Sequence, residues 1–467
     1  MCPHFKFQNQ NQITMCRRRR KRVLSLILFV VFGSVAETAS AQSGAYDIRS
    51  AIQTAISNNY SLKADSLNLR MADEKKKEVK AGYLPQANFT TQSEYNPAIA
   101  SQLLPGSVIG QPNKDYVGVK FGTRYNMRAG VEVTQALYRK DLKLQVKNAA
   151  LQKGIESSKF NLSKEELVYQ VATSFYSLQA YAEMLRTNNR DYTNMKGVLA
   201  IAQAQYDNGV LKKIDLQSLQ INVANLLSNI QQLQTNYDEQ LTRFNYLLGL
   251  PAAAKTVIAD TITAGTGQAE IRGGIFQRED IRLSRQLIES KEVEMNAIRA
   301  ESKPSVNSYF RYYYNSQFND PGKAFNGDYS YRSSTVGVTM TVPILDGNRR
   351  KSRVNTARLQ LEQLKLQDNQ KLEQAHMEQA SAALTFGNNQ EQVAITRHNL
   401  ALAMDVFTAR RELYAQGVSS LMELLEAEKE LSNADNLHIQ ALIDLQTARL
   451  DMHKANGSLL TDFINTL

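Results

Sequence analysis

The sequence predicts a mainly α-helical protein with a membrane β-barrel, built from a duplicated unit of strand, strand, long helix and helix. Three observations predict this fold. Two stretches of more than 60 residues, 141–206 and 348–414, lack proline and place apolar residues at helical spacing. Shorter segments alternate apolar and polar residues. The whole plan then occurs a second time along the chain.

The composition excludes several protein classes. The chain has 467 residues, with 55 Lys and Arg against 45 Asp and Glu, which gives a formal net charge of +10. Its two cysteines are too few for a disulfide framework or a cysteine-rich zinc module. A mean hydropathy of -0.39 excludes a bundle of transmembrane helices. The positive charge, taken by itself, suggests nucleic acid or an anionic membrane as partner.

The N-terminus has the pattern of a secretory signal peptide, which we expect to span residues 1–41. The basic run 17–22 precedes an apolar run at 23–35 and the small-residue site 39–41. The apolar run is shorter than the roughly 20 residues of a spanning helix, and Met15 is an alternative start to Met1. This segment holds seven of the basic residues, one acidic residue and both cysteines. The exported chain therefore has a net charge of +4, which no longer indicates nucleic acid.

The remaining chain repeats itself at an offset of 208 residues. Residues 131–137 are echoed by 339–345, Gly209 by Gly417, and Gly249 by Gly457. We expect a first repeat at 42–251, a linker in the equatorial region at 252–277 and a second repeat at 278–467. Pro85 precedes the shared block in the first copy and Pro304 precedes it in the second. The first copy has 11 more residues than the second between this proline and the block.

Each repeat contains three predicted helices. In the first copy they span 47–82, 141–206 and 214–248, and in the second 279–303, 348–414 and 421–456. A helix of 66 residues is about 100 Å long, and the two shorter helices of the first copy together match that length. Helices this long without internal caps indicate a coiled coil or a helical repeat.

Between each proline and long helix the period changes to two. From 121 to 133 the odd positions are mostly apolar and the even ones polar or glycine, and 335–342 alternate likewise. Such segments, with the aromatic residues of 309–331 nearby, are typical of outer-membrane strands, although a soluble half-buried sheet alternates in the same way. The export signal and the polar loops 96–116 and 317–328 favour the membrane.

Two segments per repeat give four strands per chain, which cannot close a barrel alone. Lipid-exposed strand edges leave backbone groups unpaired, so spanning strands must close. Two chains supply eight strands, whose interior is filled by side chains, and three supply twelve. A pore therefore favours three or more copies.

Several short motifs together resemble the TolC-type outer-membrane efflux protein family, over about residues 46–460. They are 58–63 (NNYSLK), 81–85 (AGYLP), 342–347 (VPILDG) and the paired Gly-Val turns. The resemblance implies a homotrimer with a twelve-stranded β-barrel in outer-membrane lipid, continued by a long α-helical barrel into the periplasm. It implies an exit duct of a tripartite efflux pump or type I secretion system. Its partners would be a periplasmic adaptor protein and an inner-membrane transporter.

The resemblance also implies site residues near the two hairpin tips. Gly209, Val210, Gly417 and Val418 match adaptor-docking tips, although the glycines also serve simply to close the turns. Asp215 and Tyr414 match a latch between hairpins, while the usual basic latch position is Ser419 here. Glu423 and Glu426, three apart on one helix face, match an acidic ring that narrows the closed end. Ordinary solvated glutamates are the alternative.

Other functions find less support in the sequence. The five histidines show no metal-ligand spacing, and no phosphate-binding loop, dinucleotide fingerprint or nucleophile elbow occurs. We therefore expect no enzyme activity, cofactor, metal or nucleic-acid partner. The alternative function is a periplasmic or surface coiled-coil scaffold, or adhesin, without a pore. The sequence does not specify the cargo.

Overall fold

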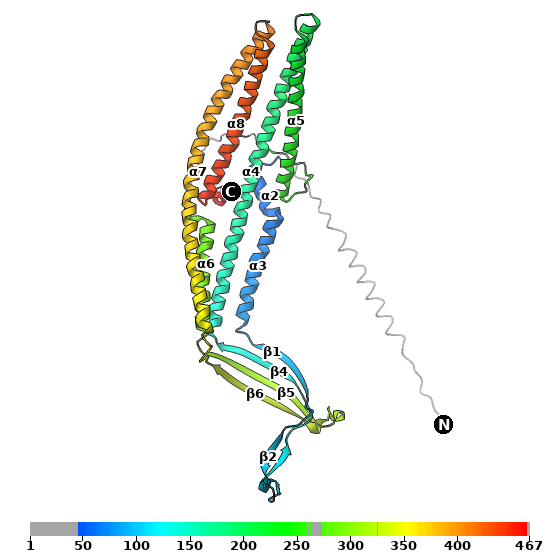
Figure 1. The fold of residues 1–467 in the computed structure, drawn as a ribbon, viewed down its shortest axis with the longest axis vertical. Helices are drawn as coiled ribbons and strands as arrows, with labels where there is room; N and C mark the ends of the chain where they lie inside the picture. The colour runs from blue at the N-terminus through cyan, green and yellow to red at the C-terminus, as the bar shows by residue number, and fades with distance from the viewer. Residues whose placement is uncertain (1–44, 260–261, 263–272, 325, 465–467) are drawn as a thin grey trace, which may run out of the picture. The chain divides into compact units, whose positions relative to one another are not determined.

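A computed structural model describes residues 45–259, 262, 273–324 and 326–464. The predicted signal peptide and the centre of the predicted linker lie outside these residues. The chain divides into two units, 1–45 and 46–467, and all the helices and strands of Figure 1 belong to the second.

The predicted order of elements occurs in both copies. The first copy comprises α2 (Ile48–Asn58), α3 (Tyr60–Ala81), β1 (Gln86–Tyr95), β2 (Ser101–Pro105), β3 (Tyr116–Lys120), β4 (Tyr125–Tyr138), α4 (Lys140–Asp207) and α5 (Lys213–Leu248). The second comprises α6 (Glu279–Ala300), β5 (Ser305–Phe318), β6 (Ser330–Thr341), α7 (Arg349–Ala415), α8 (Leu421–Ala455) and α9 (Leu459–Ile464). The two long helices are confirmed within one residue at each end.

The single helix predicted at 47–82 is wrong, because Asn59 divides it into α2 and α3. The Asn59 side chain accepts a hydrogen bond from the amide of Leu62 and donates one to the carbonyl of Leu247. It thus caps the start of α3 and fastens this break to the end of α5. No proline or glycine marks the position, so the helical pattern alone gave no sign of the break.

The four predicted strands form one antiparallel sheet in the order β1-β4-β5-β6. The register aligns Phe89, Val131 and Tyr312 on one face, and Thr90, Gly130 and Tyr313 on the other. The predicted polar loop at 96–116 is more ordered than expected, because β2 and β3 pair there as an additional hairpin. This hairpin accommodates the extra residues of the first copy.

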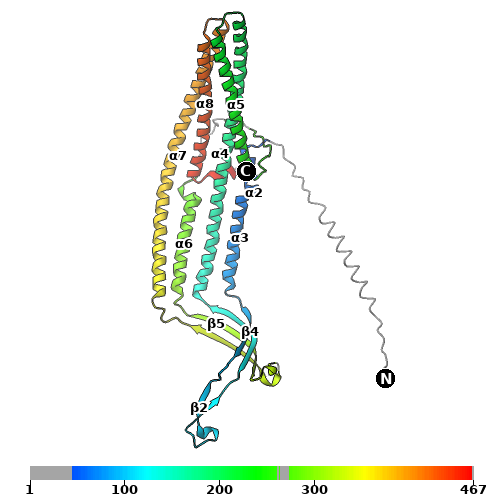
Figure 2. The same cartoon turned by 45° about the vertical axis from the view of Figure 1, so that its right-hand side comes forward.

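The long helices organise the rest of the unit. α4 packs against α5 over one part of its length and against α3 and α6 over another, and α7 lies against α8 and α6 in the same manner (Figures 1 and 2). Two shorter helices of each copy therefore lie along different parts of its long helix, which agrees with the matching lengths noted for the first copy. In the described part of the chain, none of the helices is both apolar and long enough to span a bilayer.

A hydrophobic cluster joins the two copies near the middle of α4. Its largest fully buried members include Ile52 of α2, Phe175 of α4, Phe244 of α5 and Leu450 of α8. Burying a side chain of this size contributes about 2 kcal/mol. The cluster draws on both repeats, so neither copy completes its own core.

Candidate functional site: the hairpin tips

Each long helix ends in a tight turn around a glycine with a left-handed backbone. Gly209 has a φ of 72° and Gly417 a φ of 76°, a region that costs a residue with a side chain about 1 kcal/mol or more. The amides of Val210 and Val418 bond back to carbonyls five residues earlier, at 2.9 and 3.0 Å, which completes a Schellman motif. Both glycines are thus explained by turn geometry, and each tip also presents a valine that is more than 70% exposed.

A buried cluster behind the tips holds the two hairpins together. All four of their helices contribute to it: Met195, Val198, Ala202, Leu216, Leu219, Val223, Phe407, Tyr414, Leu421, Leu424, Ala427 and Leu431. Separating the hairpins would expose part of this cluster to water, at a cost of about 25 cal/mol for each Å² of apolar surface. The two hairpins of one chain are therefore held together by packing as well as by polar contacts.

The predicted latch residues lie beside this cluster. Tyr414 is 5% exposed, and its hydroxyl donates to Oε1 of Gln205 on α4 at 3.2 Å. Burial, followed by the nearby carboxylate of Asp215, raises the pKa of Tyr414. Asp215 lies in the first turn of α5. The polar link between α7 and α4 thus runs through Gln205, and the latch role of Asp215 and Tyr414 stays a prediction.

Glu423 is tied within its own hairpin. Its Oε2 contacts a guanidinium nitrogen of Arg410 on α7 at 2.6 Å and accepts from the Ser419 hydroxyl at 2.5 Å. Both charged side chains are over 40% exposed, so the pair contributes at most about 1 kcal/mol. The resemblance led us to expect a basic residue at position 419, which is Ser419 here. Arg410, on the facing helix α7, supplies a basic group that contacts the same glutamate as Ser419.

Glu426 lies exposed on α8 and lines a groove between α5 and α8 of about 620 Å³. Glu428 lines the same groove but is 5% exposed. Burial, followed by the charge of Asp191, raises the pKa of Glu428. The two predicted gate residues therefore have different surroundings, one compensated by Arg410 and the other facing the groove.

A second polar link between the hairpins was not predicted from the sequence. Arg190 of α4 contacts Asp191 at 3.2 Å and reaches Asp435 of α8 at 2.9 Å. Burial raises the pKa of both carboxyl groups, although Arg190 opposes the shift. The available signal was that Asp435 lies four residues from both Leu431 and Ile439, and that Asp191 lies four residues before Met195. Spacing alone did not reveal their shared partner.

The profile of the outer membrane efflux protein family matches residues 51–250 and 275–458. The chain belongs to this family. Its members are outer-membrane channels that extend into the periplasm and are not enzymes, so this efflux protein is an outer-membrane protein without catalytic function. The expected resemblance is therefore confirmed.

Curated relatives of this efflux protein are distant. It is 20% identical over 284 residues to nodulation protein T of Rhizobium leguminosarum bv. trifolii, covering 58% of this chain and 59% of the relative. It is 24% identical over 288 residues to the cation efflux system protein CusC of Escherichia coli strain K12, covering 61% of each. These two alignments span about three fifths of the relatives' length. The probable efflux pump outer membrane protein TtgC of Pseudomonas putida is 21% identical over 416 residues, covering 87% of this chain and 82% of TtgC.

Solved structures share the fold. A crystal structure of CusC superposes with a TM-score of 0.70 at 19% identity, covering 88% of this chain and 92% of CusC. The outer membrane protein VceC of Vibrio cholerae gives a TM-score of 0.72 at 14% identity, covering 88% and 96%. The arrangement of sheet and long helices in this efflux protein is thus that of known outer-membrane channels.

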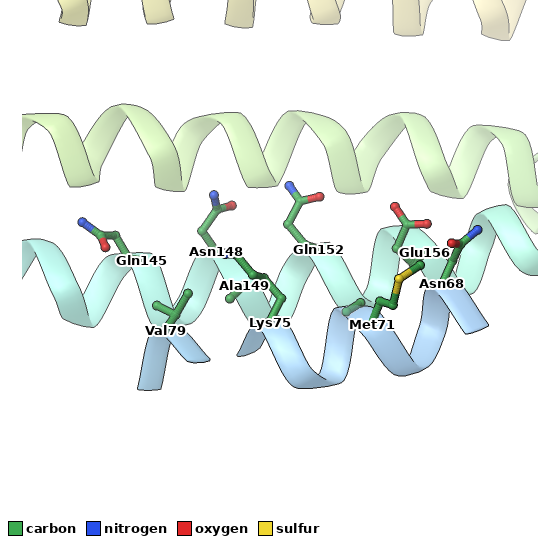
Figure 3. A pocket seen from close by; sticks show the side chains of 10 residues that line it. Asn68, Met71, Lys75, Val79, Gln145, Asn148, Ala149, Gln152 and Glu156 are labelled. Carbon is green, nitrogen blue, oxygen red and sulfur yellow. The ribbon is translucent and has the colours of Figure 1, made fainter. Parts of the chain in front are cut away.

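A groove of this efflux protein with a volume of about 740 Å³ lies away from the tips, between α3 and α4. Figure 3 shows Met71 and Lys75 of α3 beside Asn148 and Gln152 of α4. Gln152 donates to the hydroxyl of Ser290 on α6, which donates to Asn148. The amides of this groove therefore fasten α4 to α6, and none of the predicted site residues lines it.

Proposed function

We propose that this efflux protein is a homotrimeric exit duct. Three chains supply twelve strands to one outer-membrane barrel, and their long helices continue it as an α-helical barrel into the periplasm. The duct is passive and serves a tripartite efflux pump or a type I secretion system. Its partners are a periplasmic adaptor protein and an inner-membrane transporter. Efflux is favoured because the relatives CusC and TtgC are named for efflux.

The four-stranded sheet carries this proposal. Its edges are β1 and β6, and its apolar face is open, with Phe89 exposed by 72% and Val336 by 79%. An unpaired backbone group in lipid costs several kcal/mol. Pairing β6 of one copy with β1 of the next satisfies both edges, and three copies close a barrel wide enough for a pore.

Each repeat, 42–251 and 278–467, contributes two strands and one hairpin, with 252–277 as the linker between them. Opening begins when the adaptor binds the tips at Gly209, Val210, Gly417 and Val418 and draws the hairpins apart. This movement breaks the Tyr414 contact with Gln205, near Asp215, and exposes part of the tip cluster. Glu423 and Glu426 line the constriction that this movement widens.

Reconstitution of the mature protein tests the proposal. In detergent, light scattering should give three chains per particle, and insertion into a planar bilayer should produce discrete conductance steps. A monomer that needs no detergent and never conducts would overturn the duct and support the scaffold without a pore. A trimer that forms but does not conduct would retain the assembly and contradict the channel.

A further inference from the structure

The polar face of the sheet carries a ladder of charged and aromatic side chains on β4 and β5. The guanidinium of Arg128 lies 3.8 Å from the ring centroid of Tyr313. The Tyr313 hydroxyl donates to Glu132 at 3.2 Å, and the other carboxylate oxygen of Glu132 contacts Arg311 at 2.8 Å. Arg311 lies 4.4 Å from the ring of Tyr309. Five side chains thus form one continuous structure along the face.

Two glycines make this ladder possible. A methyl group on Gly130 would lie 2.5 Å from a ring carbon of Tyr313, and one on Gly337 would lie 2.5 Å from Cζ of Tyr309. The tyrosine rings therefore lie against the backbone of the neighbouring strand, as aromatic side chains do when they cover a glycine in a sheet. Tyr313 is 8% exposed, while Arg128 above it is exposed. The outermost groups of the ladder are guanidinium groups rather than rings.

Arg128 and Arg311 differ in whether a carboxylate compensates their positive charge. Arg311 is paired with Glu132, so this pair carries no net charge. Arg128 is held by the ring of Tyr313, and its register partners on the adjacent strands are Gln92 and Asn315, both neutral. Glu94 is another carboxylate on this face. It lies two register pairs from Arg128, opposite Asn126, and accepts a hydrogen bond from Gln92. Arg128 is therefore an exposed positive charge on the polar face that is stacked on a ring rather than ion-paired with a carboxylate.

We propose that Arg128 forms an anion-contacting ring inside the pore, which binds carboxylate, phosphate or sulfate groups of passing solutes. The proposal rests on the duct proposed above, in which the apolar face meets lipid and the polar face lines the lumen. Three copies place three guanidinium groups at one level. Each presents forked donors that match planar oxyanions, and stacking on Tyr313 limits the freedom that Arg128 must lose on contact. Rings of one charge sign raise the local concentration of counter-ions.

The mature chain offers a direct test, because both cysteines precede residue 42. Arg128→Cys is introduced into the full mature protein, and the reversal potential is measured in a planar bilayer across a KCl gradient. The variant should shift the reversal potential toward that of K⁺. A cationic methanethiosulfonate reagent applied to the open channel should restore it, and an anionic reagent should shift it further toward K⁺. Arg128→Lys, which keeps the charge, should retain the wild-type value.

Arg332→Cys is the matched control, since it removes the same charge from the opposite face of the sheet. It should leave the reversal potential unchanged. Glu94→Gln, on the same face as Arg128, should shift it away from K⁺. Wild-type values for Arg128→Cys before and after both reagents would overturn the ring, as would equal shifts for Arg128→Cys and Arg332→Cys. Absence of any wild-type conductance would instead contradict the proposed duct.

Discussion

Glu423 and Glu426 are one helical turn apart on α8, but only the carboxylate of Glu423 is paired with a basic side chain. Glu423 is held by Arg410 and Ser419, whereas Glu426 faces the groove between α5 and α8. A carboxylate in contact with a guanidinium attracts a further cation less strongly, because the two charges partly cancel. The cation affinity of the proposed gate should therefore reside mainly in Glu426.

Single substitutions at the gate separate these contributions. Glu426→Gln should weaken block of the conductance by periplasmic Mg²⁺ several-fold, while Glu423→Gln should change it little. Arg410→Gln should strengthen the block, because it releases Glu423. Planar-bilayer recordings over a Mg²⁺ titration measure all three variants. If the Glu423→Gln and Glu426→Gln channels respond alike, compensation by Arg410 does not govern the gate.

At the residue scale, the sequence predicted residues that the backbone conformation requires, but not which side chains contact each other. Gly209 and Gly417 could be placed from the sequence because a helical hairpin requires a left-handed residue at its turn. Gln205 and Arg410 could not be identified as the partners of Tyr414 and Glu423. Partner choice depends on how α4 and α7 rotate against their neighbours, and that rotation is set by the packing of the whole tip cluster.

The α4 helix places one carboxyl group in an unfavourable position. Burial raises the pKa of Glu165 to about 7, with Lys454 and Arg278 opposing the shift and Asp280 and Glu279 adding to it. Against the ordinary value of 4.5, the folded protein holds this proton more tightly than the unfolded chain. The contribution of Glu165 to stability is therefore greatest below pH 4.5, falls as the pH rises to about 7, and stays lower above it.

Glu165→Gln should remove this pH-dependent loss. At pH 8 the free energy of unfolding of the variant should exceed that of the wild type by up to ~3 kcal/mol, at about 1.4 kcal/mol per pKa unit. The variant should therefore unfold at a higher temperature. At pH 4.5 the two proteins should unfold at nearly the same temperature. Thermal unfolding of the detergent-solubilised protein, followed by circular dichroism at both pH values, measures the difference.

The neighbouring residue provides the control. Nζ of Lys454 donates a hydrogen bond to Oε2 of Glu166 at 2.8 Å, and this bond lowers the pKa of Glu166. The charged form of Glu166 is therefore favoured in the folded protein. Glu166→Gln should give no stabilisation at pH 8. Equal stabilisation by the two substitutions would show that general removal of negative charge, and not the burial of Glu165, is responsible.

Helix and strand boundaries could be predicted where the spacing of apolar residues changes. They could not be predicted where a single side chain ends a helix. The long helices and the four sheet strands were predictable because the period switches between 3.6 and 2, with a proline just before β1 and β5 and a glycine just before α7. The break at Asn59 depends on a cap and on the distant carbonyl of Leu247. The β2–β3 hairpin lies in the segment where the first copy has extra residues. The sequence showed that these residues are extra, but not that they pair as strands.

At the scale of the whole molecule, α7 carries an apolar stripe that its own chain leaves open. The side chains are 37% to 77% exposed: Leu359, Leu366, Met377, Leu384, Ile395, Leu402 and Leu413. Their spacing alternates between 7 and 11 residues, so the pattern recurs every 18 residues, which is five turns of an α-helix. Leu384 is two and a half turns from the buried Ala375, so the stripe lies opposite the face that packs within the chain. Such a stripe is typical of an interface between copies.

Leu384→Glu should prevent formation of the proposed trimer. Three copies would bury three such carboxylates in an apolar contact, and each unpaired charge costs several kcal/mol on burial. Thr385→Glu adds the same charge one residue away, on an exposed flank of α7, and should leave the trimer intact. Light scattering in detergent reports the number of chains per particle, and circular dichroism verifies that helix content is unchanged. A Leu384→Glu protein that remains trimeric and conducts normally would exclude this stripe from the subunit interface, because no arrangement with Leu384 buried tolerates that charge.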